Sequence, residues 1–189
     1  VLSQSLRDLE VIVVVDGPDP ATETALDSFT DPRLRRIVQP DQRGPGVARN
    51  TGALAATGQW VAFLDDDDEW LPTKLEKQLA MLPQDGSVDP ERTALVTLSR
   101  VMTPQGPFIR PIQGYAGDIS LDEWMFDRRS WLKGGQSFLQ TSSFMFPRPM
   151  FDRLQFADSR LHEDWELMIR AVKEQGCTLL TAPEPLVVH

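Results

Sequence analysis

The stretch Trp60–Trp70, WVAFLDDDDEW, joins an apolar segment directly to a run of acids. Residues 60–64 have the length and composition of a buried strand, and the next five residues, 65–69, are all Asp or Glu. Neighbouring carboxylates repel one another, so a fold that places such a run at the end of a buried strand favours a bound cation. A solvated acidic loop is the usual alternative, but it requires neither the buried strand nor Pro72. We therefore predict a metal-dependent enzyme with its site at the end of this strand.

Strands and helices alternate through the first half of the chain. The β-branched run LEVIVVV at residues 9–15 is typical of a strand buried on both faces of a parallel sheet. The alternation predicts an α/β fold with a mostly parallel central sheet flanked by helices, whose ligands bind beyond the carboxyl ends of the strands. Asp16 and the acidic run both follow strands, so we expect them to meet at one crevice. Further strands are predicted at residues 34–38 and 60–64, and helices at residues 21–29, 47–56 and 71–82.

The second half of the chain is less regular. Residues 104–117 contain many helix and strand breakers, and a helix follows His162-Glu163-Asp164-Trp165 and ends at Gly176. No repeat or linker divides the chain, so we predict one domain over residues 1–189. Strands are predicted at residues 93–102, 140–146, 177–180 and 186–188, and a short helix at residues 119–126.

Composition excludes several classes of partner. The chain has 19 Lys and Arg against 28 Asp and Glu, and its net charge of -9 argues against binding to nucleic acid. Cys177 is the only cysteine, so no intrachain disulfide can form and a reducing cytoplasmic location is favoured. No apolar stretch approaches the roughly 20 residues that cross a bilayer, so we expect no transmembrane segment; peripheral attachment to a membrane is the alternative location.

Three segments of the chain carry recognisable motifs, and they are LEVIVVVDG (9–17), RGPGVARNTGALAATGQWVAFLDDDDEWLPTKL (43–75) and HEDWELMIRA (162–171). Together, and in this order, they resemble family 2 glycosyltransferases of the GT-A fold. The resemblance implies transfer of a sugar from a nucleotide diphosphate donor, with a UDP-sugar favoured, to an acceptor hydroxyl with inversion at the anomeric carbon. A saccharide, a lipid-linked sugar or a protein would be the acceptor. Residues 1–92 would form the nucleotide-sugar and metal half, and residues 93–189 the acceptor half.

The same resemblance assigns the acids that would bind the donor. The family's DxD element falls on Asp65, Asp66 and Asp67, with Asp67 as the direct ligand of Mn²⁺ or Mg²⁺ and Asp65 beside it. Such an ion neutralises the charge that gathers on a diphosphate leaving group, and carboxylates are the hard ligands it prefers. Asp16 matches the acid that hydrogen-bonds the donor base, with a local turn made with Gly17 as the alternative.

Basic and late acidic residues complete the implied site. Arg43 and Arg49 would meet donor phosphates, although Arg49 is equally plausible as a surface helix residue. Asp164 is the candidate general base that deprotonates the acceptor, and Glu163 is the alternative base. A helix N-terminus lowers the pKa of an acid, so burial would have to compensate at Asp164. Capping of the helix is the structural alternative for both acids.

Two aromatic residues are candidates for the acceptor site. Trp124 and Trp131 could stack on a sugar face, and the alternative for each is a place in the core. The chain also departs from the family, because relatives begin with a strand and a turn ahead of the helix that leads into Leu9. We therefore expect an incomplete base and ribose pocket.

Two other functions remain open at this point. A non-catalytic relative would hold a nucleotide sugar without turning it over. A metal-dependent nucleotidyltransferase would share the strand-end carboxylates, but it would be expected to show a basic, glycine-rich phosphate loop early in the chain.

Overall fold

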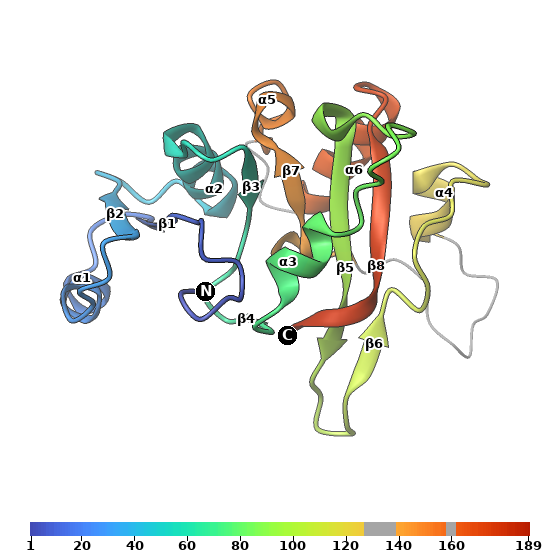
Figure 1. The fold of residues 1–189 in the computed structure, drawn as a ribbon. Coiled ribbons are helices and arrows are strands. Elements are labelled where there is room, and N and C mark those ends of the chain that lie inside the picture. The colour runs from blue at the N-terminus through green and yellow to red at the C-terminus, as the bar shows by residue number, and fades with distance from the viewer. Residues whose placement is uncertain (127–138, 158–161) are drawn as a thin grey trace.

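The computed structural model describes residues 1–126, 139–157 and 162–189, which form an α/β fold (Figure 1). The first half contains β1 (Val11–Val15), α1 (Pro20–Asp27), β2 (Leu34–Val38), α2 (Pro45–Ala55), β3 (Trp60–Ala62), β4 (Glu69–Trp70) and α3 (Lys74–Leu79). The second half contains η1 (Pro90–Arg92), β5 (Thr93–Val101), β6 (Phe108–Arg110), α4 (Leu121–Phe126), η2 (Thr141–Ser143), β7 (Met145–Pro147), α5 (Arg148–Phe151), α6 (Glu163–Lys173) and β8 (Thr178–Val188). The predicted α/β class is therefore confirmed.

The direction of the strands differs from the prediction. The larger sheet has the order β3-β7-β5-β8-β4, with β6 paired to β5, and within it only β5 and β8 run parallel among the described pairings. A separate parallel pair is formed by β1 and β2. The expectation of a mostly parallel sheet is thus wrong, because the strands of the second half enter the sheet from both directions.

The strand β1 lies apart from the larger sheet. Most of its residues are half-buried rather than buried on both faces, and α2 packs against it. Gly52 permits this close approach, because a Cβ there would lie 3.1 Å from Val14 Cγ2. A cavity of about 1720 Å³ is lined by both β1 and β3, and no described strand pairs with both of them.

Three element boundaries correct the sequence-based prediction. The helix expected at residues 71–82 is α3, which begins only at Lys74, because β4 keeps the chain extended by pairing with Val187 and Val188. The two strands expected near the C-terminus are one strand, β8, whose pairing to β5 shifts register close to Pro183 and Pro185. The strand expected at residues 140–146 is a 3₁₀ turn followed by the short β7, and β6 lies within the stretch rich in breakers.

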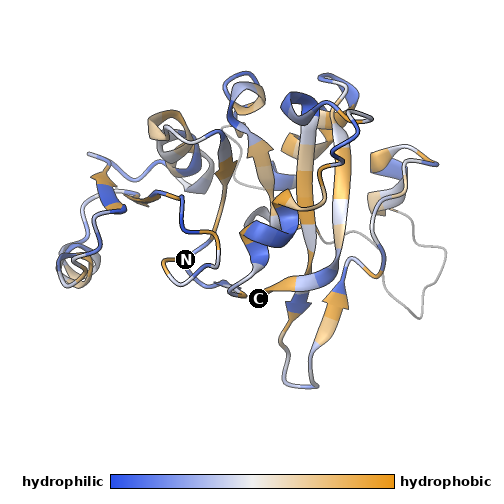
Figure 2. Ribbon diagram, in the orientation of Figure 1, coloured by the Kyte–Doolittle hydropathy of each residue, from blue (hydrophilic) through white to orange (hydrophobic). Residues whose placement is uncertain are grey.

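The core surrounds the middle of the larger sheet. Strand β5 is buried from Thr93 to Ser99, and α6 turns Leu167, Met168 and Ala171 towards the sheet. Apolar residues are concentrated in β5, β7 and β8, as Figure 2 shows. Among the described residues, no helix is both long and apolar enough to cross a membrane.

Candidate active site

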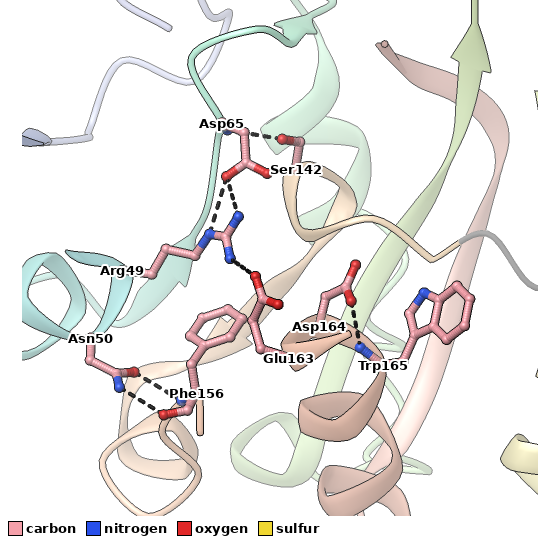
Figure 3. Close-up of polar contacts among 8 residues, drawn as sticks. All are labelled: Arg49, Asn50, Asp65, Ser142, Phe156, Glu163, Asp164 and Trp165. Atoms are coloured by element: carbon pink, nitrogen blue, oxygen red, sulfur yellow. Dashed lines mark hydrogen bonds and ion pairs between the residues drawn. The ribbon is translucent and has the colours of Figure 1, made fainter. Parts of the chain in front are cut away.

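An ion network at the end of β3 joins the two halves of the chain (Figure 3). Arg49, on α2, donates from Nε and Nη2 to Asp65 Oδ1 at 3.1 and 2.7 Å. Its Nη1 donates to Glu163 Oε1, at the start of α6, at 2.8 Å. The guanidinium also lies over the Phe156 ring, 5.3 Å from the centroid. Arg49 thus connects the first acid of the acidic run to the acid beside the predicted base.

The pKa values of the groups in this network depend on burial and on their charged partners. The side chain of Arg49 is 14% exposed and that of Glu163 is 13% exposed. Burial would lower the pKa of Arg49, but Asp65 and Glu163 outweigh it and raise that pKa. At Asp65, burial raises the pKa of the carboxyl and outweighs the opposite effect of Arg49. Arg49 is therefore a largely buried cation held by two acids, rather than a surface helix residue.

Asp164 lies next to Glu163 in the first turn of α6 (Figure 3). Its Oδ1 accepts a hydrogen bond from the Trp165 backbone N–H at 2.8 Å. Burial raises the pKa of this carboxyl, and the charge of Glu163 adds to that effect, whereas the Trp165 N–H and Arg49 lower it. Burial therefore outweighs the lowering that its place at the helix start favours. A general base at the start of a helix requires such a raised pKa, because the helix N-terminus alone would lower it.

Ser142 holds both ends of the acidic loop, residues 65–70. The Asp65 backbone N–H donates to Ser142 Oγ at 3.0 Å, and the indole N–H of Trp70 donates to the Ser142 carbonyl at 2.8 Å. The Gln78 amide donates to the Ser143 carbonyl at 2.9 Å, so α3 is tied to the same turn. Sequence reasoning missed Ser142, because a serine between two predicted strand residues carries no signal of such a contact.

The middle of the acidic loop is open to solvent. Asp66 and Asp67 are exposed, whereas the Asp68 side chain is buried against His189 and contacts its Nδ1. Asp68 directly precedes β4. Asp16 lines the same large cavity as Asp65–Asp68, as the expectation of one shared crevice requires.

A divalent ion would fit this loop only together with a bound molecule that supplies further oxygen ligands. In the described ranges, His, Cys, Asp and Glu side chains form no group of three or more arranged to hold a metal. Mg²⁺, however, commonly takes one or two protein carboxylates and completes its shell with phosphate oxygens and water. Asp67 offers an exposed carboxylate of the required kind, while Asp65 is shared with Arg49. The donor set suits an ion that arrives with a diphosphate.

Asp16 shapes the turn that begins α2. Its two carboxylate oxygens accept the backbone N–H groups of Arg43 at 2.8 Å and Gly44 at 2.7 Å. Gly44 has a φ of 95°, a conformation that favours glycine. The local bonding of Asp16 is thus across to the next loop and not to Gly17. The side chain of Arg43 is exposed, and Arg43 is not among the residues that line the cavity.

Asn50 fastens α2 to the segment that precedes α6. Its side-chain amide donates to the Phe156 carbonyl and accepts the Phe156 N–H, each at 2.9 Å. This pair of bonds fixes the distance between Arg49 and the second half of the chain. Asn50 therefore has a positioning role.

The two aromatic candidates for the acceptor site have different outcomes. Trp124 is 4% exposed and packs in the core against Tyr115, with ring centroids 5.6 Å apart. The core interpretation of Trp124 is therefore the correct one. Trp131 lies outside the described residues.

Several known proteins are similar to this chain. The family model described as Glycosyl transferase family 2 matches residues 1–155. The amylovoran biosynthesis glycosyltransferase AmsB of Erwinia amylovora is 28% identical over 191 residues, which cover 97% of this chain and 60% of AmsB. The UDP-Glc:alpha-D-GlcNAc-diphosphoundecaprenol beta-1,3-glucosyltransferase WfgD of Escherichia coli is 35% identical over 82 residues, 43% of this chain and 32% of WfgD. The chain thus spans 60% or less of the length of these relatives.

A solved structure supports the fold. The structure of S. aureus TarS 1–349 in complex with UDP matches 99% of this chain and 53% of that protein, with a TM-score of 0.68. Sequence identity is 15%, so this likeness concerns the fold alone. It confirms the predicted GT-A type.

Proposed function

The chain belongs to glycosyl transferase family 2, and on this premise we propose that it moves a sugar from a nucleoside diphosphate donor to an acceptor hydroxyl, with inversion. The observation that carries the proposal is the Arg49 bridge. It brings Asp65, in the loop assigned to the donor diphosphate, to the same guanidinium as Glu163, next to the predicted base. The donor diphosphate and the base that acts on the acceptor would then lie close together.

Asp164 is the favoured general base. In an inverting transfer, the acceptor oxygen forms a bond to the anomeric carbon while the bond to the diphosphate breaks, and the acceptor proton passes to the base. Glu163 is already engaged by Arg49, whereas Asp164 Oδ1 accepts a hydrogen bond from the Trp165 backbone N–H and Asp164 forms no ion pair among the described residues. A pKa raised by burial brings Asp164 closer to neutral pH, where a base works best.

The donor would lie along the cavity that Asp16 and the acidic loop share. Asp16 would bind the base through its carboxylate, and Arg43 and Asp66 would approach the phosphates. Mn²⁺ or Mg²⁺ bound with the donor would neutralise the diphosphate as it leaves, with Asp67 as the main protein ligand and Asp65 beside it. Because Asp65 already pairs with Arg49, we expect Asp67 to contribute more to binding of the ion.

The names of similar proteins indicate the kinds of donor and acceptor. TarS was solved with UDP, and WfgD uses UDP-Glc and a GlcNAc-diphosphoundecaprenol. We propose a UDP-sugar donor and a lipid-linked saccharide acceptor, with a free saccharide or a protein as alternatives. Residues 1–92 would serve the donor and residues 93–189 the acceptor. The protein would act in polysaccharide or glycoconjugate synthesis on the cytoplasmic side, peripheral to the membrane.

The proposal is tested first by binding of the donor and then by formation of the transfer product. Thermal unfolding with a panel of UDP-sugars, each with and without Mn²⁺, should identify a donor by its stabilisation. That donor and a synthetic GlcNAc-diphosphate lipid should then release UDP and give a product of inverted anomeric configuration by NMR. Release of pyrophosphate instead would identify a nucleotidyltransferase. Stabilisation by donor without UDP release, to acceptor or to water, would identify a binding-only relative.

A further inference from the structure

The hairpin formed by β5 and β6 extends past the rest of the larger sheet (Figure 1). Large apolar side chains on and beside it are open to solvent. Among the described residues, four of the seven exposed large apolar side chains fall within residues 102–112, and they are Met102 (56% exposed), Phe108 (40%), Ile109 (42%) and Ile112 (44%). Such a concentration on one projecting element is typical of an interaction surface.

The charge of this region differs from that of the chain as a whole. Residues 93–117 contain Arg100 and Arg110 and no acid, in a protein of net charge -9. Arg100 is exposed, and the Arg110 guanidinium lies over the Phe108 ring, 4.8 Å from the centroid. The hairpin is thus an apolar and basic surface on an acidic protein.

The apolar side chains lie on both faces of the hairpin. In the antiparallel register, Phe108 pairs with Val101 and Ile109 pairs with Arg100. Successive residues of a strand point to opposite faces, so Phe108 and Ile109 face opposite sides. A folded protein partner that packs on a sheet covers one face, whereas the boundary region of a bilayer surrounds both.

The backbone of the hairpin also suits an apolar surrounding. Pro104 and Pro107 lie in its loop and Pro111 directly follows β6. Proline has no N–H, so this edge carries fewer donors that would need water. Anionic head groups would complement the two arginines, each of which contributes attraction near such a surface.

The β5 arm of the hairpin is joined through His189 to the acidic loop. The His189 N–H donates to the Arg100 carbonyl at 2.9 Å, and the Met102 N–H donates to the His189 carbonyl at 2.7 Å. The His189 side chain contacts Asp68. A surface that binds the hairpin would therefore lie close to the loop assigned to the donor.

We propose that the β5–β6 hairpin docks on the surface of an anionic lipid bilayer, with Phe108 and Ile109 in the boundary between head groups and acyl chains. The proposal sharpens the peripheral membrane location given above. It does not depend on the transfer reaction, so its test needs neither donor nor acceptor.

The first experiment measures co-sedimentation of the protein with POPC vesicles that contain one quarter POPG. Phe108→Ser and Ile109→Ser should each weaken binding about tenfold, because each removes an apolar side chain from the boundary. Arg100→Gln should weaken binding about fivefold, and only on vesicles that contain POPG. The matched control is Phe29→Ser, since Phe29 is 57% exposed beyond the end of α1 and should leave binding unchanged.

A second experiment reports on the two faces separately. Cys177 is buried, and burial raises the pKa of its thiol to about 11, so a new exposed cysteine can be labelled selectively. NBD attached at Phe108→Cys and at Ile109→Cys should brighten at both positions when POPG vesicles are added. The same labels on Phe29→Cys should not respond.

Three results would overturn the proposal. The wild-type protein could fail to bind POPG vesicles, or the two serine variants could bind as well as the wild type. Brightening of one label only, with a dimer in light scattering that Phe108→Ser abolishes, would assign the hairpin to contact between copies of the chain. Unfolding midpoints equal to the wild type would show that the variants are folded, as expected for exposed positions.

Discussion

Two cations, one largely and one fully buried, lie near opposite ends of the acidic loop, and they are held in opposite ways. Arg49 pairs with the carboxylates of Asp65 and Glu163. Lys74 is fully buried on α3, and its described contacts are Gln78 Oε1 at 2.8 Å and the Trp70 ring at 4.2 Å from the centroid. In the part of the chain that the structure describes, no ion pair includes Lys74.

The two groups differ in the direction in which their pKa is shifted. Two acids keep Arg49 charged against the effect of burial, and its pKa is raised. Burial lowers the pKa of Lys74 well below its ordinary value. The charge of Arg49 therefore serves to hold two acids in place, whereas Lys74 acts mainly through its packing and its hydrogen bond. The predictions below test this division from the largest expected effect to the smallest.

The largest effect should come from the acid that Arg49 leaves unoccupied. Asp164→Asn should lower kcat by about 10²–10⁴, because it removes the proton acceptor and keeps the shape of the side chain. Donor affinity should stay nearly unchanged, and calorimetry with the donor would measure it beside the rate. Near-normal turnover in this variant would move the role of base to Glu163.

Replacing Arg49 should lower the free energy of unfolding. Arg49→Met leaves Asp65 and Glu163 without their cation, and removing one member of a buried ion pair costs about 3–5 kcal/mol. Urea unfolding at pH 7 should show a loss near the lower value, since Asp65 is partly exposed. The matched control is Arg36→Met, whose partner Asp27 is exposed, and it should cost less than about 1 kcal/mol. Equal losses in the two variants would contradict the role assigned to Arg49.

Asp67 should matter for ligand binding and not for stability. Its carboxylate is exposed, so Asp67→Ala should leave the unfolding free energy within about 0.5 kcal/mol of the wild type. Donor binding in Mn²⁺ should weaken by at least about tenfold, until it equals binding without metal. Calorimetry with and without Mn²⁺ measures this, with Asp27→Ala as the control. A full metal effect in Asp67→Ala would assign the ion to Asp65 or Asp66.

Local patterns were sufficient to predict much of the site. The run after Leu64 and the acids after His162 are continuous in sequence, and their place at a strand end and a helix start follows from hydrophobic periodicity. That Asp16 and the acidic loop line one cavity is consistent with the rule that ligands bind at strand ends.

Contacts between distant segments were not predictable in the same way. Ser142 holds residues 77 and 72 positions earlier, and Asn50 bonds Phe156 across 106 positions. Nothing in a serine or an asparagine indicates such a partner. The prediction of strand direction was wrong for a similar reason, because the antiparallel pairing of β3 with β7 depends on the path of the intervening chain.

Lys74 should give the smallest effect and the clearest dependence on pH. At pH 10, Lys74→Met should cost about 1 kcal/mol, since the hydrogen bond to Gln78 is lost. As pH falls below the ordinary lysine value, the unfolded wild-type chain binds a proton that the folded protein resists, so wild-type stability decreases. The methionine variant lacks this decrease, and its deficit should shrink or reverse by pH 7. Urea unfolding at several pH values measures the difference, and a deficit that grows towards pH 7 would mean that Lys74 is a paired cation like Arg49.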